Sequence, residues 1–475
     1  MIIPYLVGSV IIAGALFLNS NRLLNKLLVI AFMILQWAFT LFELFHKGMV
    51  EYSYFLPDAL ALLLLITVSI ISIPAMAHSY DYIYHEKDNP RTRGIYYGAM
   101  VLLVMSLSAA YLSSHIAVTW IFVEITTLSA SALIFHRRNA GSIEATWKYV
   151  FVSSISLVFV FIGILFLSIA LGKGKEEGMF YSELVNLAPE LNTFWLKMAF
   201  IFIFTGYTTK LGLVPMYTAG IDAKDKAPTP AAALFSSVLM NVGFVGMFRF
   251  YQVVAHTSIH PWANHVIMIA AFLSIFVATV YMLKVKNIKR MLAYSSIEHM
   301  GLIMLGLVAG GIGYYAAVLH LILHSFAKSA LFLQIGHLYK TFKTKNIYAI
   351  GNYFKYNVSG AVFLLLAFIV VTAMPPSGLF ISEFYIFKAL FEGGLIWLLI
   401  PVLILLTMII WALGKNILKM VFIPPVGFNE EKVDPVNPYE TLSQYLLLGL
   451  VIYLGINPPQ AFVDLIHEAV KNLTF

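Results

Sequence analysis

The sequence contains no cysteine, and only 11% of its 475 residues are charged. The absence of cysteine excludes disulfide bonds, thiolate zinc sites, cysteine-ligated iron–sulfur clusters and covalently attached haem. Soluble domains average about a quarter charged residues, so this chain has less than half of the usual charge. We therefore expect no cofactor in this chain, and we do not expect it to fold as a soluble protein.

Hydrophobic residues make up 60% of the chain. No soluble core could bury so much apolar surface, so the solvent for most of the chain must be lipid. The formal net charge is +7, from 30 Lys and Arg against 23 Asp and Glu. A positive balance can indicate nucleic-acid binding, but in a membrane protein it more often reflects basic cytoplasmic loops. No nucleic-acid partner is expected.

Segments nearly free of charge recur at the roughly 20-residue length that spans a bilayer. They predict an all-α polytopic membrane protein with about fourteen transmembrane helices. The first segment lacks a basic start and a cleavage site, so it is interpreted as a transmembrane helix rather than a signal peptide. The predicted helices are Ile2–Leu18, Leu27–Phe42, Ala59–Ala77, Gly94–Ser114, Ile116–Phe135, Tyr149–Leu171, Met198–Ile221, Ala227–Phe248, Val266–Leu283, Met291–Gly310, Tyr314–Tyr339, Tyr356–Phe387, Gly393–Gly414 and Thr441–Val463.

The loops between the predicted helices divide sharply by charge. Every second loop, beginning with the loop that holds Arg22 and Lys26, is basic, whereas the opposite loops contain few basic residues, such as Lys47, Lys173 and Lys175. Cytoplasmic loops are enriched in Lys and Arg. The division therefore predicts that both termini lie on the non-cytoplasmic side of a prokaryotic plasma membrane.

None of these loops is long enough to form a soluble domain. The longest, 173–190 and 424–440, are short and rich in Gly, Pro and acidic residues. The sequence also has no P-loop, no dinucleotide fingerprint and no nucleophile elbow. Redox or hydrolytic chemistry must therefore belong to another chain. Whether this chain is part of an enzyme depends on the chains with which it assembles.

Two isolated charges lie inside predicted helices: Glu124 in WIFVEITTLSASALI and Lys210 in FIFTGYTTKLGLVP. An ionisable side chain at membrane depth is costly unless it is paired or hydrated, so both are candidates for an ion pathway. The alternative is a purely structural ion pair, which apolar residues could replace at little cost. We expect the two side chains to lie within salt-bridge or single-water distance. Asp58 and Arg249 lie near helix ends, where we expect them to reach the membrane interface.

Prolines interrupt the seventh and twelfth predicted helices, and each interrupted helix also carries charge. The prolines are Pro215, Pro375 and Pro376, and the accompanying charged residues are Lys210, Glu383 and Lys388. Broken helices at membrane depth are tolerated only inside protein or along a hydrated cavity. A kink without a transport role is the alternative, but two interrupted, charged helices at matched positions favour an ion pathway.

The matched positions predict two five-helix repeats, at 94–252 and 253–422. Because five is an odd number, the second repeat must be inverted in the membrane relative to the first. A three-helix segment, 1–93, precedes the repeats. The last transmembrane helix and the C-terminus, 423–475, follow them.

His320, His324 and Lys328 follow one another at i, i+4 and i+8 in the eleventh predicted helix. Steps of four residues drift only about 40° around a helix, so the three side chains line one face. His-x-x-x-His could bind zinc, but no nearby carboxylate or third soft ligand completes a site, so no metal is expected. A proton relay fits better, because imidazole titrates near neutral pH. Structural hydrogen bonds between helices are the alternative. Glu298 and His299 form a further pair in the tenth predicted helix.

Several motifs occur together along the chain. They are Glu124 in the fifth predicted helix, Lys210 in the broken seventh, the stretch from Asp222 to Thr229, NIKRMLAYSSIEHMG, HLILHSFAKSALFL, and PPSGLFISEF with Glu383. Together they resemble the proton-conducting antiporter-like family, which includes subunits L, M and N of respiratory complex I, the large Mrp antiporter subunits and subunits of group 4 nickel–iron hydrogenases. Within that family, SSIEHMG and PPSGLFISEF look most like hydrogenase-4 component F.

The sequence departs from the family pattern at two places. Asn241 stands where complex I subunits usually have a lysine in the eighth helix, and Lys224 replaces the histidine of the family's D-A-H motif. An amide can hold water but cannot carry a proton as a titrating group. Conduction at Asn241 would therefore have to run through water.

The resemblance implies a proton-translocating membrane subunit of a redox-driven complex, such as a membrane-bound hydrogenase or a complex I-like oxidoreductase. It implies other membrane subunits and a peripheral arm with iron–sulfur or nickel–iron centres as partners, besides the lipid bilayer and protons or sodium ions. The implied pathway contains Glu124, Lys210, Asn241, His320, His324, Lys328 and Glu383, with Glu298, His299, Lys388 and Asp222 as secondary candidates. An Mrp-type sodium/proton antiporter subunit and a non-conducting scaffold subunit remain alternatives.

Overall fold

The computed structural model describes the whole chain except residues 86–88, 173–177, 425–437 and 474–475. Within this part the protein is helical, with isolated bridge pairs and no extended strand. Eleven of the described helices are long and apolar enough to cross a membrane, and Ile2–Leu18 and Val358–Val371 are shorter apolar helices. The prediction of an all-α polytopic membrane protein is confirmed.

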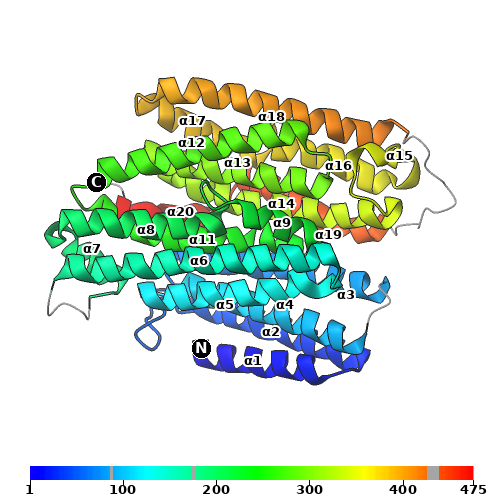
Figure 1. The fold of residues 1–475 in the computed structure, drawn as a ribbon, viewed down its shortest axis with the longest axis horizontal. Helices are drawn as coiled ribbons and strands as arrows, with labels where there is room; N and C mark the ends of the chain where they lie inside the picture. Colours follow the sequence, from blue (N-terminus) through cyan, green and yellow to red (C-terminus); the bar gives the residue numbers. More distant parts are fainter. Residues whose placement is uncertain (86–88, 173–177, 425–437, 474–475) are drawn as a thin grey trace. The chain divides into compact units, whose positions relative to one another are not determined.

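Two compact units divide the chain. The first unit consists of residues 1–231, 238–267 and 464–475. Its helices are α1 (Ile2–Leu18), α2 (Arg22–Phe45), α3 (Ala59–His85), α4 (Pro90–Leu112), α5 (Ile116–Ile134), α6 (Ala140–Leu171), α7 (Tyr181–Leu187), α8 (Thr193–Leu211), α9 (Thr218–Lys226) and α11 (Val238–Ala255). Within this unit α1 packs on α4, α4 on α5, α5 on α6 and α6 on α8, so the long helices lie side by side (Figure 1).

The second unit consists of residues 232–237 and 268–463. Its helices are α13 (Ile288–Ala309), α14 (Ile312–Phe342), α15 (Tyr353–Tyr356), α16 (Val358–Val371), α17 (Gly378–Glu392), α18 (Ile396–Phe422) and α19 (Leu442–Ile456). In this unit α14 contacts α13, α16, α17 and α19. Three helices, α10 (Thr229–Phe235), α12 (His260–Lys284) and α20 (Gln460–Val470), have residues in both units.

Each of the fourteen predicted segments contains a helix, but the ends differ. Several helices are longer than predicted because they continue past charged residues, as α2 does at Arg22 and Lys26. The prediction of a single helix over the last segment, Thr441–Val463, is wrong, because α19 ends at Ile456 and α20 begins at Gln460. Two consecutive prolines, 458 and 459, separate them, and proline can neither donate the helical hydrogen bond nor follow a helical residue comfortably. The predicted inversion of the second repeat stays a prediction.

Both predicted proline interruptions are confirmed. Helix α8 ends at Leu211 and Gly212 follows it with a φ of +75°, a left-handed conformation that glycine adopts without strain; α9 begins only at Thr218. Likewise α16 ends at Val371 and α17 begins at Gly378. Ser377 caps α17, because its hydroxyl accepts a hydrogen bond of 3.1 Å from the backbone N–H of Phe380.

A third interruption was not predicted. The eighth predicted segment divides into α10 and α11, with Ser236 and Ser237 between them and no proline at the break. Both serine hydroxyls donate to the carbonyl of Ala233, at 3.2 and 2.7 Å. Such side-chain bonds compete with the helical hydrogen bonds. The Ser-Ser pair was the only signal of this break in the sequence.

Candidate ion-translocation sites

In the first unit, Lys210 is a buried cation held by neutral hydroxyl groups. It lies in the last turn of α8 and is 4% exposed. Its ammonium group donates to Thr127 Oγ1 at 2.8 Å and to Tyr149 OH at 3.1 Å. Gly243 of α11 packs directly against it: a Cβ there would lie 2.8 Å from Lys210 Cβ. The close approach of α11 and α8 therefore fixes the base of the lysine side chain.

Glu124 lies on the same face of α5 as Thr127, one helical turn away. Its Oε1 accepts a weak 3.5 Å hydrogen bond from Ser154, and its Oε2 is buried with no partner among the described residues. In the part of the chain that the structure describes, no carboxylate lies within 4.0 Å of the Lys210 ammonium group. The two charges are therefore not a direct ion pair. Lys210 instead contacts Thr127, which lies one turn from Glu124 along α5.

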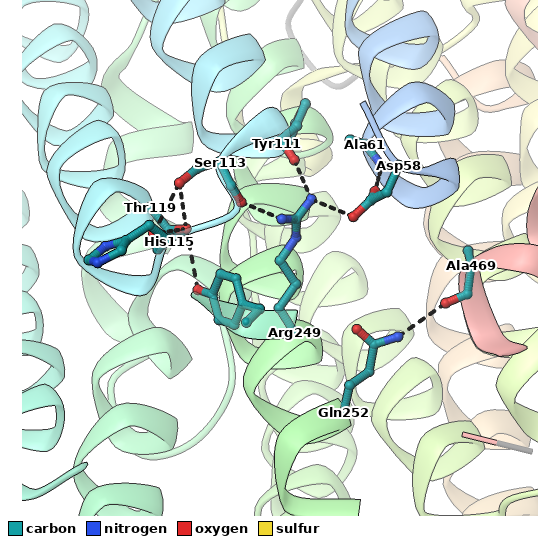
Figure 2. Close-up of polar contacts among 10 residues, drawn as sticks. Asp58, Ala61, Tyr111, Ser113, His115, Thr119, Arg249, Gln252 and Ala469 are labelled. Carbon is teal, nitrogen blue, oxygen red and sulfur yellow. Dashed lines mark hydrogen bonds and ion pairs between the residues drawn. The ribbon is translucent and has the colours of Figure 1, made fainter. Parts of the chain in front are cut away.

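Arg249, a second buried cation of the first unit, is bound very differently. Figure 2 shows its guanidinium group reaching from α11 to Asp58, Tyr111 and Ser113. It forms an ion pair of 2.9 Å with Asp58 and donates to the backbone carbonyls of Tyr111, at 2.7 Å, and of Ser113. It also lies over the ring of Tyr181, 5.6 Å from the centroid. The expectation that Arg249 extends to the membrane interface is wrong, because the side chain is only 4% exposed and both of its Nη atoms are engaged, while its buried Nε has no hydrogen-bond partner among the described residues.

The remaining candidates of the first unit have surroundings of their own. Asn241 is fully buried in α11, and Lys224 is 4% exposed in α9 with its ammonium group 3.1 Å from the sulfur of Met240. Asp222 is half-buried and lies 3.8 Å from the ammonium group of Lys148. Asp222 therefore belongs to a partly exposed ion pair on the surface of the unit.

In the second unit, three histidines from two helices lie together. Nδ1 of His299, in α13, lies 3.0 Å from Nε2 of His320, in α14. Nδ1 of His320 lies 2.8 Å from the hydroxyl of Ser382, in α17. The ring of His324 lies 5.1 Å from the ring of His299, centroid to centroid. All three histidines are completely buried. A chain of hydrogen bonds thus joins α13, α14 and α17.

Two carboxylates lie beside His299 of this chain, and Lys328 is buried in the same unit. Nε2 of His299 lies 3.7 Å from Glu298, and Nδ1 of His299 lies 4.0 Å from Glu383. Lys328, one further helical step along α14, donates to Ser295 Oγ at 2.6 Å. Glu298, Glu383 and Lys328 are all at least nine-tenths buried. The second unit therefore gathers two carboxylates and a lysine around its histidines.

This arrangement corrects the reason for expecting no metal. The sequence suggested that no carboxylate lies near the helical histidines, but Glu298 and Glu383 both do. His299, His320 and Glu383 place one possible ligand atom each within 4.8 Å of one another. Two imidazoles and a carboxylate are a known type of zinc ligand set. These three residues are the ones that could hold a metal, and the absence of a metal stays a prediction.

Lys388 is not part of the buried cluster. It lies on the exposed side of α17, 46% exposed, and its nearest acidic partner is Glu392 at 3.7 Å, one turn along the same helix. A solvated ion pair of this kind contributes little to the stability of the fold. The charge that follows the proline break on the buried side of α17 is Glu383.

The sequence model of a family described as "NADH:quinone oxidoreductase/Mrp antiporter, TM" matches residues 113–409, more than half of the chain and the region that holds both buried clusters. The chain belongs to this family. The antiporter-like subunit is 29% identical, over 94% of each chain, to a hydrogenase-4 component F homologue of Methylacidiphilum infernorum. The predicted family and the antiporter-like fold are confirmed.

Two solved structures have the same fold. One is from the membrane-bound sulfane sulfur reductase, described as an archaeal respiratory membrane complex; it covers 99% of this antiporter-like subunit and 97% of its own chain, with a TM-score of 0.88 and 22% identity. The other is from the Mrp complex of Dietzia sp. DQ12-45-1b, with the same coverage and TM-score and 16% identity. Both are subunits of larger complexes, as the sequence predicts for this chain.

Several polar contacts of the antiporter-like subunit were not found from its sequence. Thr127, Tyr149, Ser295 and Ser382 hold the charged or imidazole groups of the two clusters. Serine, threonine and tyrosine are common in transmembrane helices, so these residues carry no distinctive signal of their own. The sequence offered one signal for two of them, which is their helical spacing from the candidate residues. Ser295 precedes His299 by four residues, and Thr127 follows Glu124 by three.

Proposed function

We propose that this antiporter-like subunit translocates protons as part of a redox-driven membrane complex, such as a membrane-bound hydrogenase. Its own cysteine-free sequence provides no redox centre, so the electrons would move in a peripheral arm formed by other chains. Other membrane subunits would surround it. Energy released in that arm would be transmitted to the buried charges of this chain.

The observation that carries the proposal is the chain of hydrogen bonds from His299 through His320 to Ser382, with Glu383 beside it. Each imidazole has two nitrogens and can accept a proton on one while it releases a proton from the other. Successive donor–acceptor distances of 3.0 and 2.8 Å suit such transfer. Glu383, beyond the proline break, can accept a proton from this chain and release it to water.

The first unit would control protonation through Lys210. The buried ammonium group is held by the hydroxyls of Thr127 and Tyr149 and has no carboxylate in contact among the described residues, so it depends on the more distant Glu124. Loss of the charge at Glu124, or its movement, would favour release of the proton from Lys210. The half-exposed position of Glu124 suits a residue that responds to a neighbouring subunit.

The ligand types favour protons over sodium. Hard cations are bound by several oxygen atoms in proteins, whereas the second unit presents imidazole nitrogens beside its two carboxylates, with Lys328 buried in the same unit. A sodium ion there would have to displace or face the Lys328 ammonium group. The Mrp-type antiporter alternative therefore receives less support from this geometry than proton translocation does.

The test is to replace His320 with glutamine in the intact complex. Glutamine preserves hydrogen bonding to Ser382 and His299 but cannot transfer a proton by titrating. We expect His320→Gln to leave assembly and electron transfer intact and to reduce proton uptake into inverted membrane vesicles. His265→Gln is the matched control, because His265 is exposed and bonds only to its own helix backbone, at Pro261. Normal proton uptake by His320→Gln would support the scaffold alternative instead.

We also propose that both termini face away from the cytoplasm. The native chain has no cysteine, so single cysteines can be labelled without background. The positions of Lys343 and Lys471 are both exposed. We expect membrane-impermeant maleimide to label a cysteine at Lys343 only from the cytoplasmic side and a cysteine at Lys471 only from the other. Labelling of both from one side would rule out the proposed topology.

A further inference from the structure

An apolar groove runs along the first unit between α2 and α3. Its volume is about 360 Å³, and Ile30 and Met33 of α2 face Ile73 and Ala77 of α3 across it. From Lys26 to Met33 the groove follows α2 for about 10 Å, at 1.5 Å of rise per residue. Ala77 is exposed and small, and it leaves space that a larger side chain would fill. These apolar walls are suited to binding a hydrocarbon chain.

Cations gather at one end of this groove. Arg22, Lys26 and Arg93 line the adjoining cavity, which shares Lys26, Tyr80 and Tyr97 with the groove. In the described part of the chain, neither Lys26 nor Arg93 has a carboxylate within 4.0 Å. The Lys26 ammonium group lies over the ring of Tyr80, 5.3 Å from its centroid. Three positive charges are thus focused on one small space.

Arg93 is the most deeply buried of these three cations. It is 5% exposed, and its Nη2 donates to the carbonyl of Ser20 at 2.6 Å. Its Nε is buried and has no hydrogen-bond partner among the described residues. A buried guanidinium donor without an acceptor is costly, and phosphate oxygens suit the planar fork of arginine.

We propose that this site binds one anionic phospholipid, with its phosphate against Arg22, Lys26 and Arg93 and an acyl chain in the groove between α2 and α3. A soluble anion would leave the apolar groove unused, and a neutral lipid would leave Lys26 and Arg93 without a counter-charge among the described residues. Basic pockets between transmembrane helices are known to select acidic headgroups. The lipid would join the N-terminal helices α2, α3 and α4 at their basic end.

The purified complex in detergent, titrated with phosphatidylglycerol or phosphatidylcholine and observed by native mass spectrometry, tests this proposal. We expect one phosphatidylglycerol to be retained per chain, in preference to phosphatidylcholine. The double variant Arg22→Gln/Lys26→Gln should retain phosphatidylglycerol roughly 10- to 30-fold less. The control Lys284→Gln/Lys286→Gln removes two exposed charges from the end of α12 and should bind the lipid as the native chain does.

A second variant tests the groove without altering charge. Ala77→Phe should fill the space for the acyl chain and reduce retention of phosphatidylglycerol. The proposal is overturned if either the double variant or Ala77→Phe retains the lipid normally, or if glycerol phosphate displaces it as effectively as phosphatidylglycerol does. It is also overturned if a photo-crosslinking residue at Ile73 reacts with another subunit rather than with lipid in the intact complex.

Discussion

The Arg249 site of the first unit and the histidine cluster of the second are both buried and polar, but their hydrogen bonds are of different kinds. Arg249 donates to two backbone carbonyls and to Asp58, and a guanidinium group keeps its proton at any physiological pH. In the histidine cluster, His299, His320 and Ser382 can each donate or accept. Burial of a charge therefore does not by itself identify an ion pathway. Neighbouring groups that can both donate and accept are what single out the histidine cluster as the candidate.

The largest expected effect is that of Glu383→Gln in the histidine cluster. Glutamine has nearly the same size and hydrogen-bonding capacity but cannot ionise. We expect an assembled complex with detectable electron transfer and proton uptake reduced by about tenfold or more, measured in inverted vesicles with a pH-sensitive dye. Normal uptake would remove Glu383 from the pathway. Failure to assemble would show that Glu383 is structural, like Arg249.

Substitution of Lys210 tests whether this residue takes part in proton uptake, as proposed for the histidine cluster, or is structural, as expected for Arg249. We expect Lys210→Met to abolish most proton uptake, because Thr127 and Tyr149 cannot replace a titrating amine. Lys210→Met leaves the Glu124 carboxylate without its cation, so the variant should also assemble less well than Glu124→Gln/Lys210→Met. Since the two charges are not in direct contact, the double-mutant coupling energy should be modest, about 0.5–1 kcal/mol. A coupling of zero would show that they act independently.

Substitution of Arg249 should reduce the stability of the protein and leave proton uptake unchanged. Arg249→Met leaves the carbonyls of Tyr111 and Ser113 without their donor, and we expect a loss of about 1–3 kcal/mol in stability. Asp58→Asn should cost less, because Asp58 is 37% exposed and asparagine retains an acceptor oxygen. Both losses are measured by thermal unfolding of the purified complex. Proton uptake per assembled complex should stay normal; a selective loss of uptake would place Arg249 in a pathway.

The smallest effect concerns His115, which caps α5 close to the Arg249 site. Its Nδ1 accepts a hydrogen bond of 3.2 Å from the backbone N–H of Ala117, so the cap needs an unprotonated nitrogen. Burial lowers the pKa of His115 below 6.5, although Glu183 acts in the opposite direction. The unfolded chain then binds the proton more readily, so stability is present above pH 6.5 and is lost as the pH falls below it.

Acidification from pH 7 to pH 5 should therefore lower the melting temperature of the native complex slightly more than that of His115→Asn. Asparagine is a good N-cap and does not titrate in this range. The difference should be small, because His115 is partly exposed and solvent screens its interactions. If the variant shows the same dependence on pH as the native complex, His115 does not contribute to it.

Much of the fold could be predicted from the sequence because lipid imposes a simple rule. A helix in the membrane must be apolar over about 20 residues, so each of the fourteen segments was recognisable. The breaks at Pro215 and at Pro375–Pro376 were equally visible, because proline lacks the backbone donor. The break at Ser236 and Ser237 and the division of the last segment at Ile456 were missed. Local hydrogen bonding and helix ends decide those features, and hydropathy is insensitive to both.

The candidate site was predicted in part. His320, His324 and Lys328 could be placed on one face of a helix from their spacing alone. Their contacts with Glu298, His299, Ser382 and Glu383 come from two other helices. The sequence therefore identified the titrating groups without their partners. For the same reason it could not distinguish Arg249, which three elements enclose, from an arginine at the membrane surface.

By itself, the sequence determined that this protein lies in a membrane, that its helices are broken at two charged places and that it contains no cysteine-bound redox centre. Those properties depend on composition, periodicity and the chemistry of single residues. Only the tertiary structure decided which buried groups have fixed donors and acceptors around them and which lie beside groups that can both donate and accept. That distinction depends on distances between helices far apart in the chain, such as the 3.0 Å between His299 and His320 and the absence of a carboxylate within 4.0 Å of Lys210 among the described residues. Side chains on separate helices meet only through packing, and packing is a property of the whole fold.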